Sequence, residues 1–356
     1  MRIVITGASG NIGTALLREL EPSWEVTGIA RRIPDLVAEP YAGVSWLQSD
    51  LGEPGAADEL ARAFDGADAV VHLAWAISPA WDEPAMWRTN ENGTRHVLDA
   101  AAKAGVGHLV CASSVAAYGP GPREEKVGEE FPRTGIPASA YSRGKAELEA
   151  VLDAFAEAHP AIGLARIRPC AVVQQGAAGE FTRWLLGPVI PPGLLGRRLL
   201  PVPLWEGLRV QAVHAEDVAS ALRLIVEQRA TGPFNLAAPD VLDAKALAGI
   251  IGGLRLPVRK SVTRFAARVA WTAGLQPLHP GWLELADRAA LVDTTRAEMM
   301  LGWQPRHSTR ETVTELIGAV RDKVAGASPP LARASTGLKS RVRALGRLRP
   351  TRQSQA

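Results

Sequence analysis

Residues 2–13 read RIVITGASGNIG, a run of β-branched apolar residues followed by three glycines and a helical pattern that starts at Asn11. Glycines let the backbone turn tightly and let a pyrophosphate approach the main chain, and the first turn of the following helix offers free N–H groups. The stretch therefore predicts a strand, a phosphate-binding loop and a helix. The residues expected to hold a dinucleotide are Gly7, Ser9, Gly10, Asn11, Ile12 and Gly13. The spacing is GxxGxxG rather than GxGxxG, so a purely structural turn remains the alternative.

Outward from this loop, short β-rich runs alternate with helical patterns through the first half of the chain. Such alternation is typical of repeated βαβ units and of a parallel sheet. Strands are expected at residues 2–6, 25–29, 44–47, 69–73, 108–112 and 163–167, and helical stretches begin near residues 11, 56, 84 and 138. The pattern predicts an α/β fold, a Rossmann doubly wound parallel sheet with a smaller, mainly helical C-terminal region.

The second half of the chain has a different organisation. Residues 174–208 are rich in Pro, Gly, Trp and Leu without periodicity, a composition that fits loops covering a site. Strands at 210–213 and 233–236, with a helix at 216–228 between them, are expected to rejoin the main sheet, and 239–325 is largely helical. We therefore expect a nucleotide-binding Rossmann domain (1–173 and 209–238), a capping region (174–208 and 239–325) and a basic flexible tail (326–356).

Composition limits the class of protein. Hydrophobic residues make up 47% and charged residues 22%, which is ordinary for a globular chain. The two cysteines, Cys111 and Cys170, lie in apolar runs typical of buried strands, so free thiols in a reducing compartment are expected. The first strand leaves no room for a signal peptide, and prolines and glycines break the longest apolar stretch, at 184–195. We therefore expect a cytoplasmic protein without a transmembrane segment.

Residues 326–356 hold seven basic residues and no acid, which leaves the rest of the chain slightly acidic. An acidic body gives no electrostatic footprint for nucleic acid, so no nucleic-acid partner is expected. The tail itself, rich in Ser, Pro and Gly, is typical of a solvated, mobile terminus. The alternative is an anchor to an anionic surface, because Leu338, Val342 and Leu345 fall at helical spacing among the arginines.

The end of the second expected strand indicates which dinucleotide is bound. A site for NAD usually places an acid there to hold the ribose hydroxyls, whereas residues 28–32 read GIARR. With Ala30 in place of the acid, Arg31 and Arg32 favour the 2′-phosphate of NADP, with NAD still possible. Two ordinary surface arginines are the alternative. Asp50, followed by Leu51 after the third strand, could accept a hydrogen bond from the adenine amino group.

Tyr141 and Lys145 are the candidate pair for proton transfer. They stand four residues apart in a helical stretch, so both side chains project from the same face, and the chain has only three tyrosines with which to form such a pair by chance. A nearby ammonium favours the phenolate, which makes the tyrosine usable as a general acid or base at neutral pH. The lysine could also hold the cofactor ribose.

Ser114 follows the strand at 108–112, at the sheet edge where open α/β folds bind ligands, and its hydroxyl could steady a substrate oxygen. Ser113 is the competing candidate, although side chains alternate along a strand and only one of the two should face the site. His214 has no nucleophile or acidic partner that completes a hydrolase arrangement and is expected to be structural. The remaining histidines show no paired ligand spacing with cysteine, so no metal is predicted.

These residues belong to an ordered set of motifs that resembles the extended short-chain dehydrogenase/reductase family of NAD(P)-dependent epimerases, dehydratases and dehydrogenases. The resemblance covers about residues 1–305. Its motifs are TGASGNIG at 6–13, Asp50-Leu51, HLAW at 72–75, NENGT at 90–94, SSVAAYG at 113–119, YSRGK at 141–145, Arg168-Pro169, VHAEDVA at 213–219, Phe234-Asn235-Leu236 and LGWQP at 301–305. The family's fold implies a Rossmann domain that binds the cofactor and a smaller C-terminal region that caps the substrate.

The resemblance also implies roles for individual residues. Ser114, Tyr141 and Lys145 match the family's catalytic triad, and Asn90 matches the asparagine that supports it. The further residues that it places against the cofactor are Leu73, Ala74, Trp75, Tyr141, Lys145 and Pro169.

The sequence departs from the family at positions that bear on the substrate. The usual HLAA is HLAW, which puts Trp75 beside the expected nicotinamide site. Many nucleotide-sugar enzymes carry Arg-Asp before the VHxxD segment and Val-Tyr-Gly after Arg-Pro, whereas this chain has RVQ at 209–211 and VQQG at 173–176. Val115 and Ala116 stand where sugar dehydratases carry an acid pair. These changes argue against a nucleotide sugar and against dehydration.

We expect an NAD(P)-dependent oxidoreductase that acts on a secondary alcohol or ketone by hydride and proton transfer. The alternatives are a nucleotide-sugar epimerase that works through a transient ketone and a non-catalytic dinucleotide sensor. Five tryptophans in segments that should border the site suggest a small substrate that is apolar or ring-shaped, although core packing would explain them equally well. They are Trp75, Trp81, Trp87, Trp184 and Trp205. Ala146, Ala150 and Ala154 recur four apart in one helical stretch and suit a homodimer.

Overall fold

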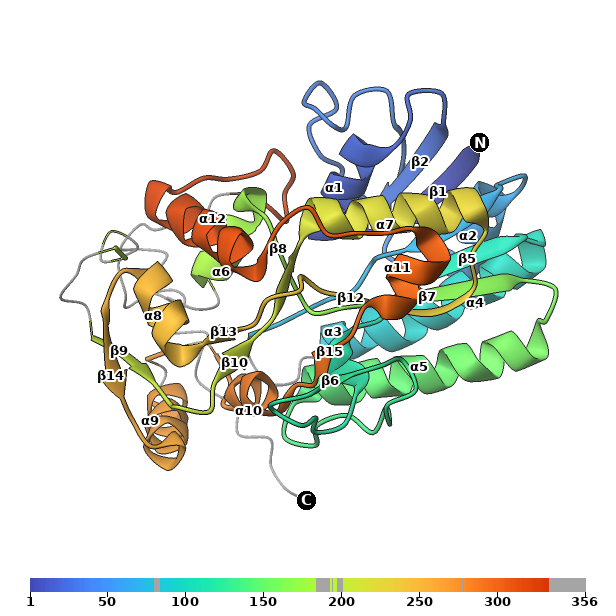
Figure 1. Cartoon of the computed structure of the whole chain (residues 1–356). Helices are drawn as coiled ribbons and strands as arrows, with labels where there is room; N and C mark the ends of the chain where they lie inside the picture. Colours follow the sequence, from blue (N-terminus) through green and yellow to red (C-terminus); the bar gives the residue numbers. More distant parts are fainter. Residues whose placement is uncertain are drawn as a thin grey trace, which may run out of the picture.

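A parallel sheet of seven strands lies at the centre of the molecule, in the order β12-β7-β5-β4-β1-β2-β3 (Figure 1). The computed structural model describes residues 1–79, 84–183, 193, 195–196, 201–273, 275–276 and 278–332. The strands of the sheet are β1 (Arg2–Thr6), β2 (Glu25–Ala30), β3 (Ser45–Gln48), β4 (Ala69–His72), β5 (His108–Ala112), β7 (Gly163–Pro169) and β12 (Gly232–Leu236). Each predicted strand of the N-terminal half is present within two residues, and the Rossmann sheet is confirmed.

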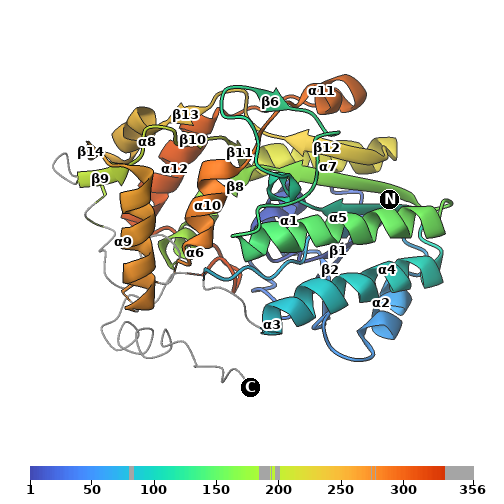
Figure 2. The ribbon, with the colours of Figure 1, turned by 90° about the horizontal axis from the view of Figure 1, so that it is seen from below.

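Helices cover both faces of the sheet, because successive side chains of each strand point to opposite sides. Ile3 and Ile5 of β1 pack in one apolar cluster with α1 and α7, whereas Val4 packs in a second cluster with α2, α4 and α5 (Figures 1 and 2). The bounds are α1 (Asn11–Glu19), α2 (Ala56–Phe64), α4 (Gly93–Ala104), α5 (Ala140–Ala158) and α7 (Ala215–Gln228). The carboxyl ends of β1, β4, β5 and β7 therefore meet at one sheet edge.

Further helices and strands make up the rest of the described chain, most of them in its C-terminal half. The helices are α3 (Pro84–Trp87), η1 (Arg88–Asn92), η2 (Val115–Ala117), η3 (Gln175–Ala177), α6 (Ala178–Phe181), α8 (Ala244–Ile251), α9 (Lys260–Thr272), α10 (Gly281–Arg288), α11 (Thr295–Leu301) and α12 (Thr309–Asp322). The strands are β6 (Lys126–Val127), β8 (Ala171–Val173), β9 (Pro201–Leu204), β10 (Arg209–Val210), β11 (Ala212–His214), β13 (Leu242–Asp243), β14 (Leu254–Pro257) and β15 (Leu291–Val292). They pair in four small sheets: β6 with β15, β8 with β11, β9 with β14, and β10 with β13.

The prediction of one strand at 210–213 that joins the main sheet is wrong, because this stretch is divided between two small sheets. β10 pairs with β13 and β11 pairs with β8, so this stretch does not join the main sheet, whereas β12 does. The break falls at Gln211, whose buried side-chain amide donates to the carbonyls of Ala238 and Val292 and accepts from the Val292 N–H. A side chain that bonds to neighbouring backbone in this way separates the two pairings.

Residues 326–332 do not belong to the mobile tail that composition predicts from residue 326. Residues 326–332 pack on the body: Leu331 and Ser328 are buried, and the Ser328 hydroxyl donates to the carbonyl of Ser9 at 2.7 Å. The remainder, 333–356, lies outside the described residues, as do the tail leucines of the anchor alternative. Among the helices of the described part, none is long and apolar enough to cross a membrane.

Candidate active site

The phosphate-binding loop connects β1 to α1. Gly7 has a positive φ of 73°, and a Cβ there would lie 2.7 Å from the Ala74 nitrogen, so only glycine lets this turn pass the end of β4. Gly10 is the N-cap of α1 and has no side chain to cap it, so the first-turn N–H groups at Asn11, Ile12 and Gly13 face outward without a side-chain acceptor. This cradle fits the pyrophosphate of a dinucleotide.

Two further contacts hold the loop in place. The Asn11 side chain donates to the Val172 carbonyl at 3.0 Å, and the Gln174 amide donates to the Asn11 carbonyl at 2.7 Å. Gln174 thus joins α1 to the segment after β8. A third residue, Ser9, accepts the hydrogen bond from Ser328 described above.

The end of β2 carries the residues expected to choose the cofactor. Ala30 is buried, whereas Arg31 and Arg32 are exposed and form no ion pair with any residue in the described ranges. Asp50 follows β3, where its carboxylate accepts from the Gly52 N–H at 3.1 Å and lies 3.8 Å from the Arg88 guanidinium. Leu51 is buried, and its carbonyl accepts a hydrogen bond from His96.

The sequence places Ser114 and Tyr141 on separate elements, and the fold brings them together. Ser114 is the N-cap of η2, directly after β5, and its hydroxyl accepts from the Ala116 N–H and donates to the carbonyl of Pro169 at 3.4 Å. Tyr141 lies in the first turn of α5, which Ser139 caps by accepting from the Ser142 N–H. Burial of the phenol raises the pKa of Tyr141, and its hydrogen bond with Ser114 offsets part of that rise. The phenol is therefore protonated at neutral pH in this arrangement.

Ser113 turns away from Tyr141, as alternation along the strand predicts. Its hydroxyl lies on the side of Glu149, where it lowers the pKa of that carboxyl. Ser114 is therefore the serine beside the tyrosine.

Lys145 lies one turn after Tyr141 on α5, with its side chain buried. Its ammonium donates to the Ala112 carbonyl at 2.8 Å and stands 3.6 Å from the centroid of the Trp75 ring, in a cation–π contact. Burial lowers the pKa of Lys145 to about 7, and the Glu149 carboxylate opposes that change. The expected lowering of the phenol pKa by this ammonium is not observed here, because the ammonium is directed at Ala112 and Trp75.

Asn90 fixes the segment that carries Trp75. Its amide group donates to the Ala76 carbonyl at 2.9 Å and accepts from the Ala76 N–H at 2.7 Å, a two-point clamp made from the π-helical turn η1. Leu73, Ala74 and Trp75 follow β4 directly, so the clamp sets where this sheet end lies beside Lys145. Asn90 acts as a positioning residue here.

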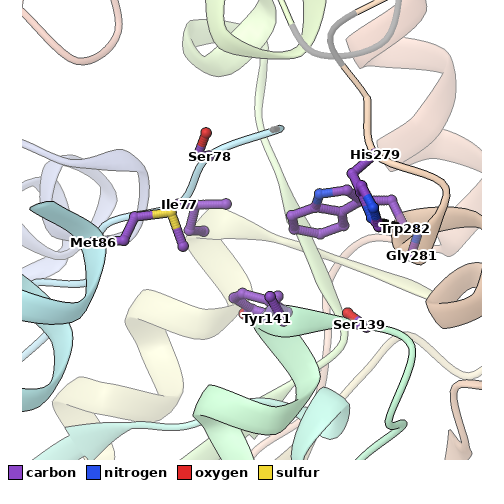
Figure 3. A pocket seen from close by; sticks show the side chains of 9 residues that line it. Ile77, Ser78, Met86, Ser139, Tyr141, His279, Gly281 and Trp282 are labelled. Atoms are coloured by element: carbon purple, nitrogen blue, oxygen red, sulfur yellow. Dashed lines mark hydrogen bonds between the residues drawn. The ribbon is translucent and has the colours of Figure 1, made fainter. Parts of the chain in front are cut away.

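The C-terminal half closes the site from the other side. Trp282, near the start of α10, stacks on Tyr141 with ring centroids 5.3 Å apart at 25°. Figure 3 shows Trp282 and His279 on one side of Tyr141 and Met86 and Ile77 on the other, around a small pocket. A Cβ at Gly281 would collide with the carbonyl oxygen of Ala138, so glycine lets α10 come this close. Burial lowers the pKa of His279 to about 4, which keeps its imidazole neutral.

A larger apolar cavity of about 290 Å³ borders Tyr141 between η1, α4 and α5. Trp75 and Trp87 line it together with Met86, Leu148 and Val151. Two of the five tryptophans expected near the site are thus beside it. Trp205 instead packs in a separate apolar cluster with Leu208 and Ala244, and Trp81 and Trp184 lie outside the described residues.

Sequence reasoning missed Trp282, His279, Met86 and Ile77. None of them lies within a recognisable motif, and Trp282 is separated from Tyr141 by most of the capping region. The stack against Tyr141 follows from the packing of α10 on the start of α5, which no spacing within one element encodes.

A family model of this architecture matches most of the chain. Residues 3–237 match the NAD dependent epimerase/dehydratase family. The chain belongs to this family. It is an enzyme family that uses a nicotinamide dinucleotide, and the loop and the Ser114–Tyr141–Lys145 group of this chain lie within the matched residues.

The relatives of known sequence leave the reaction open. An uncharacterised protein of Mycobacterium tuberculosis is 29% identical over 331 residues, which cover 91% of this chain and 30% of that protein. This chain thus spans about a third of the length of that relative. L-arabinose 1-dehydrogenase (NAD(P)(+)) of Haloferax volcanii is 36% identical over 115 residues, 32% of this chain and 41% of the relative.

Solved structures share the fold over nearly the whole chain. UDP-glucose 4-epimerase of Thermus thermophilus, in complex with NAD, has a TM-score of 0.66 at 22% identity and covers 91% of this chain and 100% of its own. A dTDP-glucose 4,6-dehydratase double mutant of Streptomyces venezuelae has a TM-score of 0.65 at 21% identity, covering 90% and 97%. At these identities the likeness establishes the α/β fold.

Proposed function

We propose that the chain transfers a hydride reversibly between NAD(P) and a secondary alcohol or ketone, with net oxidation or reduction of the substrate. The observation that carries the proposal is the Tyr141 hydroxyl beside Ser114, with Lys145 one turn away, at the sheet edge next to the phosphate loop. NAD(P), when bound, supplies the carbon that gives or accepts the hydride. The protein's own residues then transfer the proton and position the substrate oxygen.

Tyr141 is the proton donor and acceptor in this proposal. Because burial raises the pKa of its phenol, the hydroxyl holds a proton at neutral pH and can give it to a ketone oxygen during reduction. Ser114, hydrogen-bonded to the phenol, holds the same oxygen in place. Lys145, whose pKa is lowered to about 7, would assist the phenolate during oxidation in its ammonium form, by turning from the Ala112 carbonyl towards Tyr141 one turn away.

The surroundings of Tyr141 support a substrate that is apolar or ring-shaped. Trp282 stacks on one side of the phenol, and the cavity with Trp75 and Trp87 borders the other. Aromatic walls of this kind suit flat or apolar ligands.

A nucleotide sugar is the less favoured substrate. The Gln174 side chain donates a hydrogen bond to Asn11 and accepts one from Arg18. Arg209 forms an ion pair with Glu124 at 3.1 Å. These are the two regions in which the sequence departs from nucleotide-sugar enzymes. The epimerase alternative rests on the fold shared with UDP-glucose 4-epimerase. A dinucleotide sensor would have no use for the serine, tyrosine and lysine together.

Tyr141→Phe tests the mechanism by removing one hydroxyl. Turnover is expected to drop by about 10²–10⁴-fold while the cofactor still binds, since general acid–base catalysis contributes that much. Lys145→Met should impair turnover and cofactor binding together. Tyr118→Phe is the matched control, because it removes a buried hydroxyl that bonds to Asn235 and Arg168 and not to Ser114. Full activity of Tyr141→Phe would refute the mechanism.

The same assay separates the two reactions. A panel of apolar alcohols, ketones and nucleotide sugars is mixed with enzyme and stoichiometric cofactor, and the absorbance of the reduced nicotinamide is followed alongside product analysis. Net redox chemistry consumes cofactor in proportion to product. Turnover of a nucleotide sugar without any change in absorbance would establish the epimerase instead.

A further inference from the structure

Two histidines from distant parts of the chain meet at the start of α7. His214 ends β11 and His307 lies in the loop before α12, with ring centroids 4.2 Å apart. Glu216, in the first turn of α7, faces both rings. One ligand atom from each of His214, Glu216 and His307 lies within 4.8 Å of the other two. Nitrogen and carboxylate oxygen in this combination are ligands of zinc and similar cations.

His307 is held by a buried carboxylate. Its Nδ1 lies 3.1 Å from Oδ2 of Asp217, whose side chain is fully buried and also accepts from the His307 and Arg306 backbone N–H groups. This bond places the ring proton on Nδ1. The other nitrogen, Nε2, is left with a lone pair and lies 4.0 Å from Oε2 of Glu216.

His214 is held in the complementary way. Its Nε2 lies 3.4 Å from Oε1 of Glu315 on α12, and its Nδ1 accepts the Glu216 backbone N–H at 3.3 Å. The ring proton therefore sits on Nε2, towards Glu315. Nδ1 lies 3.8 Å from the same Oε2 of Glu216. A cation bound there would take the Nδ1 lone pair from the Glu216 N–H, a first-turn N–H of α7 that solvent would then accept.

Both imidazoles thus give one nitrogen to a carboxylate and have the other within 4.0 Å of a single carboxylate oxygen, Oε2 of Glu216. A carboxylate behind each histidine is the arrangement that orients histidines as metal ligands. We propose that His214 Nδ1, His307 Nε2 and the Glu216 carboxylate bind a divalent cation of the zinc type.

The distances suit such an ion. Ligands at about 2.0–2.1 Å from a tetrahedral zinc lie roughly 3.3 Å apart. The two nitrogens stand slightly farther than this from Glu216, at 3.8 and 4.0 Å, and the Glu216 side chain is 46% exposed and free to move inward. Solvent would supply the fourth ligand. Three carboxylates, those of Asp217, Glu216 and Glu315, lie against the two rings, facing the positive end of the α7 dipole and the Arg306 guanidinium, which lies against Asp217.

The ion would join the Rossmann sheet to the C-terminal helix. β11 and α7 belong to the chain segment that packs on the sheet, whereas His307 and Glu315 belong to the segment of α12. Metal bound across them would stabilise the docking of α12. The site is separate from Tyr141 and Lys145, so its outcome does not depend on the proposed reaction.

The test uses the full chain without a polyhistidine tag, stripped with EDTA and dialysed. Titration with ZnCl₂ is expected to give saturable binding of about one zinc per chain, together with a rise in the melting temperature. Loading with Co²⁺ should give the visible absorption bands of a four-coordinate site. Glu216→Gln, which keeps the size of the side chain, and His307→Ala should each weaken zinc binding at least tenfold and remove the melting shift.

His159→Ala is the matched control, because it removes a histidine at the end of α5 that takes no part in the cluster. It should bind zinc as the wild type does. The proposal is overturned if the wild type does not bind zinc saturably, or if Glu216→Gln and His307→Ala bind it as well as the wild type and the control. A histidine cluster held only by hydrogen bonds would give that result.

Discussion

At the scale of single residues, Lys145 is surrounded by groups that act on its charge in opposite directions. Burial lowers its pKa to about 7, whereas Glu149 and the face of the Trp75 ring both favour the ammonium. The ring follows β4 directly, as the last residue of the HLAW motif. Trp75 therefore favours the charged form of Lys145, the lysine of the proposed active site.

The exposed arginines after β2 lead to a prediction about the cofactor. Replacing both Arg31 and Arg32 by alanine should weaken NADPH binding by about 10²–10⁴-fold, since each of the two charge-assisted bonds to a 2′-phosphate contributes about 1.5–3 kcal/mol. NADH, which lacks that phosphate, should bind nearly unchanged. Fluorescence titration of the two reduced cofactors measures both effects.

Arg62→Ala is the control for net charge, because Arg62 is exposed on α2 away from the loop. It should leave both affinities as they are. Equal NADPH affinity in the wild type and the double variant would show that Arg31 and Arg32 are ordinary surface charges, and the preference for NADP would be wrong.

The sequence could predict those residues whose role follows from spacing within one element or from one motif. Tyr141 and Lys145 are four apart on a helix, and the place of Ser114 in the family motif made it preferable to Ser113. Trp282 was not predictable in this way. Its contact with Tyr141 depends on how α10 packs against α5, which is a property of the folded chain and not of local spacing.

At the scale of elements, α5 carries its chemistry on one face. Lys145 and Glu149 lie on successive turns, and Glu149 accepts two hydrogen bonds from Arg168 of β7, at 2.7 and 2.9 Å. Arg166, on the same face of β7, lies 3.0 Å from the same carboxylate. The buried cluster of Glu149, Arg166 and Arg168 thus fixes α5 on the sheet one turn after Lys145.

Glu149→Gln should therefore destabilise the protein at neutral pH. Removing one member of a buried ion pair leaves the other charge uncompensated, at a cost of about 3–5 kcal/mol. Urea unfolding at pH 7 measures the loss. Glu157→Gln, an exposed change on the same helix, should stay within about 0.5 kcal/mol of the wild type. Equal stability of the two variants would contradict the role assigned to this pair.

The pH dependence of the same variant follows from the pKa of Glu149. Hydrogen bonds from Arg168 and its charge, which outweigh the opposing effect of burial, lower that pKa from 4.5 to about 2. A carboxyl with a lowered folded pKa stabilises the protein above its unfolded value and loses this contribution as the pH falls towards the folded value. Wild-type unfolding free energy should hence fall between pH 4.5 and 3, and the fall should be shallower in Glu149→Gln.

Element boundaries show where sequence reasoning stops at this scale. Periodicity located every strand of the main sheet in the N-terminal half, because each is a short β-rich run between helical patterns. At 209–214 the same periodicity gave one strand where the chain forms β10 and β11. The division depends on the partners of Gln211, which lie at Ala238 and Val292 and could not be read from the run itself.

At the scale of the whole molecule, the last described segment, residues 326–332, contacts the phosphate loop after β1. Ser328 donates to the carbonyl of Ser9 within the loop, and Leu331 is buried near Gly176. Arg183 donates to the Pro330 and Ala332 carbonyls at 3.2 Å and holds the segment from the other side. Composition predicted a mobile tail from residue 326, because a high content of Ser, Pro and Gly is typical of mobile termini and does not indicate these contacts.

Truncation after Ala325 should accordingly weaken the fold. It removes a buried leucine, which contributes about 2 kcal/mol, and a buried hydrogen bond, which contributes about 1 kcal/mol. A loss of this size lowers the melting temperature by on the order of 5 °C. Because Ser9 lies in the loop proposed to hold the pyrophosphate, the affinity for NAD(P) should fall as well.

Truncation after Ala332 separates these contacts from the charge of the tail. It keeps Ser328, Leu331 and the carbonyls that Arg183 binds, and it removes all seven basic residues. Its melting temperature and cofactor affinity should match those of the full chain, whereas the shorter form loses both. Ser328→Ala isolates the bond to Ser9: a lower affinity at nearly unchanged stability would trace the effect to the loop itself. If both truncations behave like the full chain, residues 326–332 do not support the loop, and the dispensable tail begins at residue 326 as composition predicts.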